Sequence, residues 1–125
     1  MKILEKENLS EENLPGRTIR KAVGKEGPSV SSKMTVGFAR YSAVNGRMQP
    51  HQHAEEVCYI LDAENGRVRY GPSPDQLSNT VNLSPGMILH VPPMEWHVFE
   101  YEEGGFVEIL FIYGQVDNIR PEEDK

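Results

Sequence analysis

The chain has little cysteine, no long apolar run and no excess of positive charge. Its single cysteine, Cys58, excludes an intramolecular disulfide, and a reducing cytoplasm is therefore the expected compartment. No stretch approaches the length of a membrane span, and the polar first residues do not resemble a signal peptide, so we expect no membrane partner. The 13 lysines and arginines are outnumbered by 19 acidic residues, which gives a formal net charge of −6. This balance argues against nucleic acid as a partner.

The length of 125 residues suits one domain with one hydrophobic core. Acidic side chains are concentrated at both ends of the chain, which predicts solvated termini. We therefore expect an N-terminal arm or edge strand at 1–30, a single barrel at 31–114 and an acidic C-terminal tail at 115–125.

Glycine and proline interrupt the apolar stretches at short intervals. Eleven glycines and nine prolines separate these stretches, a pattern typical of an all-β sandwich or barrel. The dipeptides Asn45-Gly46 and Asn65-Gly66 predict hairpin turns, because both residue types enter positive φ readily. Residues 8–13 could form one helical turn. Strands are expected near 17–23, 35–44, 49–53, 57–61, 67–70, 79–83, 87–92, 97–101 and 106–113.

The histidines are concentrated in two short segments of the chain. His51 and His53 are two residues apart, so on a β-strand their side chains share a face. His97 follows in a second segment, after Gly86 and Pro92. Neutral imidazole is the commonest transition-metal ligand, and a nearby carboxylate favours a divalent cation. A mononuclear metal site is the leading interpretation, and the alternative is two exposed strand histidines and one hydrogen-bonded core histidine.

The order of strands, turns and histidines resembles the cupin superfamily, in particular its small single-domain members. That family carries two motifs, G-x5-H-x-H-x3,4-E-x6-G and G-x5-P-x-G-x2-H-x3-N, and both occur here in order within residues 35–113. The resemblance implies an all-β double-stranded β-helix, or jelly roll, which forms a cupin barrel around one pocket. The first motif is matched, with altered gaps, by Gly46, His51, His53, Glu56 and Gly66, and the second by Gly86, Pro92, Met94, His97 and Tyr101.

Matched residue by residue, the resemblance assigns one divalent transition metal to His51, His53, Glu56 and His97. Glu55 is the alternative carboxylate, because only two residues separate His53 from Glu56, where the family has three or four. We favour Glu56 because the apolar residues after it look like the family's strand. Mn, Fe, Ni, Cu and Zn all suit this ligand set, and the open coordination positions would admit a substrate.

Several residues near these motifs have expected roles of their own. Met94 replaces a motif glycine, so its turn must take a conformation that a side chain accepts. His90 is expected to be buried or to orient a ligand, and Cys58 to be a buried apolar side chain. Tyr59 and the glutamate that does not ligate are the candidates for a general acid or base. An anionic substrate would be held by any arginine that faces inward among Arg40, Arg47, Arg67 and Arg69.

The resemblance implies two classes of function. One is a cytoplasmic metal-dependent enzyme of isomerase, lyase, decarboxylase or dioxygenase type that acts on a small polar molecule. The other is a non-catalytic ligand-binding or sensor protein in which the metal only anchors the ligand. A metal-free cupin, like the sugar-nucleotide epimerase relatives, is disfavoured by the ligand cluster. A small molecule is the expected partner in each case, and small cupins often form homodimers, so a homodimer is expected too.

Overall fold

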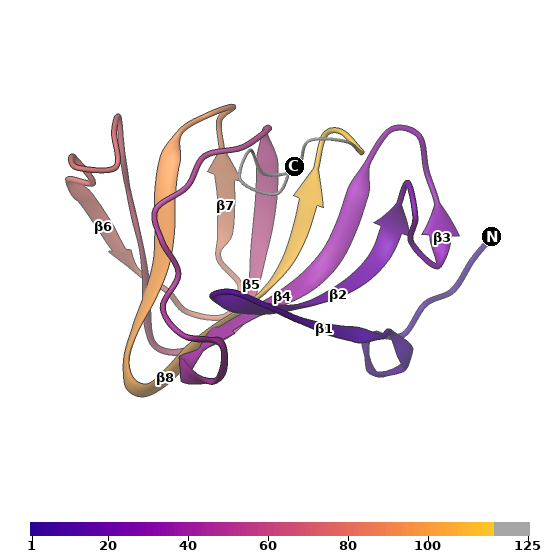
Figure 1. The fold of residues 1–125 in the computed structure, drawn as a ribbon, viewed down its shortest axis with the longest axis horizontal. Coiled ribbons are helices and arrows are strands. Elements are labelled where there is room, and N and C mark those ends of the chain that lie inside the picture. The colour runs from indigo at the N-terminus through magenta and orange to yellow at the C-terminus, as the bar shows by residue number, and fades with distance from the viewer. Residues whose placement is uncertain (117–125) are drawn as a thin grey trace.

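The structure is a computed structural model that describes residues 1–116, and it confirms the all-β class. The strands form one sheet in the order β1-β2-β4-β8-β5-β6, with β3 paired to β2 and β7 paired to β5. Figure 1 shows this sheet curving from β6 and β7 on one side to β2 and β3 on the other. The elements are η1 (Lys6–Asn8), β1 (Glu11–Leu14), β2 (Arg17–Gly24), β3 (Ser29–Val30), β4 (Thr35–Ser42), η2 (Ala43–Asn45), β5 (Glu56–Gly71), β6 (Asn79–Asn82), β7 (Ile88–Val91) and β8 (Trp96–Tyr113).

Two long strands, β5 and β8, form the centre of the sheet. They are antiparallel and pair from one end, where Glu56 lies opposite Tyr113, to the other, where Gly71 lies opposite Trp96. The first half of β5 also pairs with β7 and its second half with β6, while the second half of β8 pairs with β4. The register shifts twice along β5, and such bulges bend and twist a strand, which lets one sheet wrap around its own core.

The predicted hairpin at Asn65-Gly66 is wrong, because β5 continues through it as one strand. Asn65 takes a φ of 49°, and the register with β8 shifts between Glu64 and Gly66. A residue with positive φ occurs in a β-bulge as well as in a tight turn. Pairing with a neighbouring strand determines which of the two forms. The expected strands at 57–61 and 67–70 are therefore one element, and those at 97–101 and 106–113 are likewise joined in β8.

The dipeptide Asn45-Gly46 turns the chain, but it does not close a hairpin. It follows the short helix η2, and Gly46 has a φ of 78°. Residues 49–53, which follow this turn, do not form the expected strand, so they cannot pair with β4 as a hairpin would require. Within residues 1–116, β4 pairs with β2 and β8. The predicted helical turn at 8–13 is also displaced, since η1 covers 6–8 and β1 begins at Glu11.

The N-terminal segment is part of the same sheet. Its strand β2 coincides with the expected strand at 17–23 and pairs with β4, with Ile19 opposite Ala39. The predicted acidic tail at 115–125 lies outside the described residues from 117 onward. No helix within residues 1–116 has the length and apolarity that a membrane span requires.

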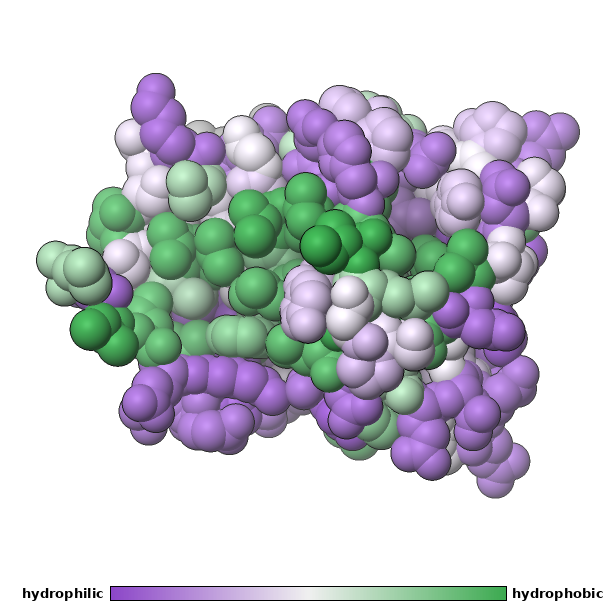
Figure 2. Space-filling model, turned by 180° about the vertical axis from the view of Figure 1, so that it is seen from behind, coloured by the Kyte–Doolittle hydropathy of each residue, from purple (hydrophilic) through white to green (hydrophobic). Residues whose placement is uncertain are grey.

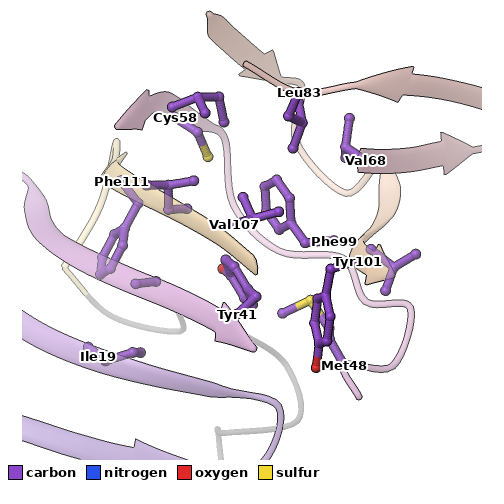
Figure 3. Packing of buried hydrophobic residues seen from close by; sticks show 14 of the residues in the cluster. Ile19, Tyr41, Met48, Cys58, Val68, Leu83, Phe99, Tyr101, Val107 and Phe111 are labelled. Carbon is purple, nitrogen blue, oxygen red and sulfur yellow. The ribbon is translucent and has the colours of Figure 1, made fainter. Parts of the chain in front are cut away.

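The hydrophobic core lies on the inner side of the curved sheet, because buried residues alternate with more exposed ones along β4 and along stretches of β2, β5 and β8. Figure 3 shows side chains from these strands pointing into one shared space. Tyr41 of β4 stacks on Phe99 of β8 with ring centroids 4.7 Å apart. Cys58 is fully buried, as expected, within this hydrophobic core. The core thus fills the interior next to the histidines.

Candidate metal centre

His51 and His97 face each other across a short antiparallel bridge. The N–H of each residue donates to the carbonyl oxygen of the other at 3.0 Å. Two residues after His51, the carbonyl oxygen of His53 accepts a hydrogen bond from the Met94 N–H at 2.8 Å. The segment that carries His51 and His53 therefore runs beside the start of β8, and their ring centroids lie 5.4 Å apart. Both rings lie on one side, as the sequence predicts, although residues 49–53 form an isolated bridge at His51 and not a strand.

Each of the three rings is held by a hydrogen bond to a nearby main-chain carbonyl. A carbonyl oxygen only accepts hydrogen bonds, so the Nδ1 atom of each ring carries the proton and donates it. A neutral ring with its proton on Nδ1 presents an unprotonated Nε2, which is a ligand atom for a metal. The Nδ1 distances are 3.0 Å from His51 to Gln49 O, 2.7 Å from His53 to Ala54 O and 2.8 Å from His97 to Glu95 O.

The three histidines converge in the interior. One ligand atom from each lies within 4.8 Å of the other two, and all three residues are buried. The Nε2 atoms of His53 and His97 are 3.1 Å apart. Two nitrogens that each bind the same ion at about 2.1 Å lie about 3 Å apart when the ligand angle is near 90°. The donor set and its spacing therefore fit one transition-metal ion, and His51, His53 and His97 form a potential metal site.

Glu56, and not Glu55, is the carboxylate beside this cluster. Its Oε1 atom lies 3.3 Å from His53 Nε2 and 4.0 Å from His97 Nε2, and the side chain is buried. Glu56 is the first residue of β5, and alternation along the strand turns it to the inner face. Glu55 is exposed and directed away, toward His90.

The prediction that His90 is buried or orients a metal ligand is wrong. Its side chain is 61% exposed, and its Nε2 lies 2.6 Å from Glu55 Oε2. On β7 the inward position belongs to the buried Val91, so the neighbouring His90 faces outward. The histidine is thus part of the outer surface.

Tyr59 also lies on the outer face, so it does not contact the histidine cluster. It follows the buried Cys58 on β5 and is 41% exposed. With Glu55 on the outside as well, both proposed acid–base candidates are removed from the site. Burial, and then the neighbouring Glu56 carboxylate, raise the pKa of the Cys58 thiol well above its ordinary value, so this thiol is not a nucleophile either.

None of the four arginines named from the sequence faces inward, and the buried arginine within residues 1–116 is Arg17. It is 5% exposed and shares the inner face of β2 with the core residue Ile19. The sequence signal for this burial is an arginine two residues before the apolar Ile19, on a strand that the sequence predicts only at the edge of the sheet. The outward arginines pair with acidic residues or are exposed: Arg40 with Glu108, Arg67 with Glu100 and Glu102, Arg69 with Glu100, and Arg47 exposed.

Tyr113 forms an aromatic wall beside the histidines, and it is not among the site residues predicted from the sequence. Its ring lies edge-on to the ring of His53, with centroids 4.9 Å apart, and the residue is buried. Tyr113 is directly opposite Glu56 in the β5–β8 ladder. The sequence signal for its inward orientation is that it shares the two-residue alternation of Ile109 and Phe111, which are also buried.

The expectation that Met94 takes a conformation that a side chain readily accepts is wrong, because Met94 adopts a left-handed conformation that favours the glycine of the motif. Its φ is 63°, in the left-handed region, and its side chain is about half exposed. The same residue donates its N–H to His53, so this turn helps to hold the ligand segment.

No protein-family model matches the chain, and no curated protein matches its sequence. Solved structures do match it. The polyketide cyclase RemF from Streptomyces resistomycificus has a TM-score of 0.77 at 24% identity, over 97% of this chain and 82% of that protein. The DMSP lyase DddQ from Ruegeria pomeroyi has a TM-score of 0.68 at 17% identity, over 87% of this chain and 57% of the lyase.

The oxalate decarboxylase of Bacillus subtilis, a protein with Mn(II) centres, has a TM-score of 0.66 at 17% identity. The match covers 91% of this chain and 29% of the decarboxylase. These structures share the cupin jelly roll, and the sheet of this chain superposes on them over nearly its whole length. The chain therefore has the fold of the small cupins.

Proposed function

We propose that this chain is a metal-dependent enzyme that acts on a small polar molecule. His51, His53, His97 and Glu56 would hold one divalent transition-metal ion. The observation that carries the proposal is the convergence of three buried imidazoles whose Nδ1 atoms donate to main-chain carbonyls, with a carboxylate oxygen 3.3 Å from one of the Nε2 atoms. Three nitrogens and one oxygen leave one or two positions open on an octahedral ion.

When bound, such an ion would act as a Lewis acid on a substrate oxygen, or bring O₂ beside it if the ion is Fe(II). Residues of the chain would set the orientation of the metal ligands and the polarity of the site. The main-chain carbonyls fix the orientation of the three rings, and the apolar core beside them lowers the local dielectric. Tyr113 would give one apolar wall for the substrate.

Arg17 is our candidate for binding an anionic group of the substrate. Its guanidinium is buried on the inner face of β2, and a guanidinium binds a carboxylate through two parallel hydrogen bonds. The reaction would be of isomerase, lyase, decarboxylase or dioxygenase type. Cyclase, lyase and decarboxylase are the activities named for the similar structures, which supports chemistry on a small molecule.

A non-catalytic ligand-binding protein is the second candidate. It is favoured by the outward position of Tyr59 and Glu55, because the inner face then lacks the acid–base groups that the sequence suggested. In that case the metal would only anchor the ligand, and no turnover would follow binding.

The test is to purify the protein without chelator, measure its bound metals by mass spectrometry, and assay Mn(II)- and Fe(II)-loaded samples. Oxygen consumption, CO₂ release and solvent-proton exchange on a panel of small hydroxy and keto acids report the reaction classes. An enzyme should show turnover that is lost in His51→Ala, and a binder should show saturable ligand binding without turnover. Absence of stoichiometric metal under every loading condition contradicts both readings.

A further inference from the structure

The segment that carries His51 and His53 has little regular structure of its own. Residues 46–55 run from η2 to Glu56, the first residue of β5, and they form one isolated bridge, that of His51 with His97. Figure 1 shows this segment as a single trace that leaves η2 at the bottom of the view and reaches β5 at the top. A segment outside the strand ladders keeps its place only where other contacts hold it.

Asn45, the last residue of η2, is fixed to the hairpin of β1 and β2 by three hydrogen bonds. Its side-chain Oδ1 accepts from Thr18 Oγ1 at 2.7 Å, and its Nδ2 donates to Asn13 Oδ1 at 3.1 Å. Its main-chain oxygen accepts from the Gly16 N–H at 2.9 Å. The side-chain amide of asparagine has one acceptor and one donor group, and both are used here. We call Asn45 with Asn13, Gly16 and Thr18 the Asn45 clamp.

The residues after Asn45 are held from two further directions. Tyr101 of β8 donates its hydroxyl proton to the Gly46 carbonyl oxygen at 3.2 Å. Met48 is buried in the hydrophobic core, and its Cα atom would lie 3.1 Å from a Cβ atom placed on Gly16. The hairpin of β1 and β2 therefore packs directly against the start of the segment, and residues 45–48 form its fixed end.

The orientation of the His51 ring depends on this fixed end. Its Nδ1 donates to the carbonyl oxygen of Gln49, the residue that follows Met48. The other two rings of the cluster use the carbonyl oxygens of Ala54 and Glu95, which lie outside residues 45–49. A ligand imidazole is oriented by the partner of its second ring nitrogen. A shift at the start of the segment would therefore displace His51 before the other two ligands.

We propose that Asn45 is a positioning residue of the metal centre. By binding the hairpin of β1 and β2 it places the Gln49 carbonyl, and so directs Nε2 of His51 toward the site. Binding sites need their ligands held within about 0.5 Å of the working geometry, which a loop achieves only through such supporting contacts. The inference rests on the proposed function for its meaning, but the anchoring of His51 is measurable without metal.

The first test measures Co(II) affinity by competition with a coloured chelator in wild type and four variants. Asn45→Ala and Thr18→Val remove side-chain bonds of the clamp, whereas Thr18→Ser keeps the hydroxyl. Asn79→Ala is the matched control, because the Asn79 amide donates to Tyr70 O at 3.3 Å on β6, away from the segment. We expect the affinity to fall by about 10-fold in Asn45→Ala and Thr18→Val, a loss typical of residues that orient metal ligands, and to stay at the wild-type value in the other two. The absorption spectrum of Co(II) bound to these two variants should shift toward that of His51→Ala.

The second test is amide hydrogen exchange in the metal-free protein. The His51 N–H donates to His97 O at 3.0 Å, and the Ile60 N–H, within β5, donates to Met87 O at 2.9 Å. The His51 amide should exchange at least about 10-fold faster in Asn45→Ala and Thr18→Val, while the Ile60 amide keeps its wild-type rate.

The assembly state of the variants is checked first. Figure 2 shows a broad apolar band on the side of the molecule opposite to Figure 1. Since such a band favours contact between molecules, all variants must elute alike in gel filtration before their exchange rates are compared.

Faster exchange at His51 with an unchanged rate at Ile60, together with weaker Co(II) binding, supports the proposal. If wild type binds no Co(II), the proposed function fails, and exchange alone decides whether Asn45 holds His51. An unchanged rate at His51 in both clamp variants overturns the proposal, as does an equal increase at Ile60, which would mean that Asn45 stabilises the whole fold. Wild-type Co(II) affinity in both variants overturns it as well.

Discussion

The Nε2 atoms of His53 and His97 lie 3.1 Å apart, and both residues are almost fully buried. Both rings donate their Nδ1 protons to main-chain carbonyls, so in the neutral rings both Nε2 atoms present lone pairs to each other. Two lone pairs at this distance repel unless a proton or a cation lies between them. The backbone of the chain thus holds in place an arrangement that favours a bound cation.

Replacing His97 by alanine should remove bound metal, because it takes away one of the three converging nitrogens. His90→Ala is the matched control, since it deletes an exposed imidazole on the outer face. Metal content per chain, measured by mass spectrometry after gel filtration, should fall to background in His97→Ala and stay at the wild-type level in His90→Ala. Equal metal content in the two variants would contradict the assignment.

Glu56→Gln should weaken metal binding by at least about 10-fold, because the carboxylate supplies negative charge next to the ligand nitrogens. Glu55→Gln should leave the affinity unchanged, because that side chain is exposed and pairs with His90. Competition with a coloured chelator measures both affinities under one condition. If Glu55→Gln showed the larger loss, Glu55 would be the ligand and the placement of Glu56 would not reflect its role.

Removing metal should lower the thermal stability of the folded protein. An ion that binds only the native state adds about 2.7 kcal/mol when its free concentration is about 100 times Kd. The melting temperature of chelator-treated protein should therefore rise on adding the bound metal. His53→Ala, which lacks one of the ligand nitrogens, should show no such rise. A metal-dependent rise of the same size in that variant would indicate binding elsewhere.

Cys58 should resist alkylation in the native protein. Its side chain is fully buried, and burial, followed by the adjacent Glu56, raises the pKa of its thiol. If exposure needs unfolding against about 5 kcal/mol, alkylation at pH 8 should be slower than in guanidinium by a factor of about 10³ or more. Tyr59→Cys places a control thiol one residue away on the outer face, where it should react at once. Fast labelling of Cys58 itself would show that β5 opens locally.

Met94→Gly should stabilise the fold by about 0.5–1 kcal/mol. The left-handed φ of 63° costs a side chain about 1–2 kcal/mol, and the added freedom of glycine in the unfolded chain offsets part of the gain. Gly86→Ala, at φ 97° with open space around the new Cβ, should lose stability for the converse reason. Urea denaturation at constant m-value compares the two variants. A less stable Met94→Gly would mean that the methionine side chain contributes packing that its exposure does not suggest.

The cytoplasmic location and the identity of the metal stay predictions from the sequence. The two-residue spacing of His51 and His53 is a local property that the sequence shows directly. His97 and the fold were predictable because the two motifs occur in the order typical of the cupins.

Short apolar stretches between glycines and prolines predicted the all-β class, and the resemblance of the two histidine motifs to those of the cupins implied a jelly roll with an imidazole cluster. Pairing between distant strands settles which face of each strand lies inside. It leaves His90 and Tyr59 outside the site, places Tyr113 beside His53 and turns Arg17 to the inner face of β2. Because β5 pairs with β8 on both sides of Asn65, this residue is part of a bulge within β5 and not of a turn. The physical reason is that inward orientation and strand register are set by pairing with strands that are distant in the chain, such as β8, and local propensity does not encode that pairing.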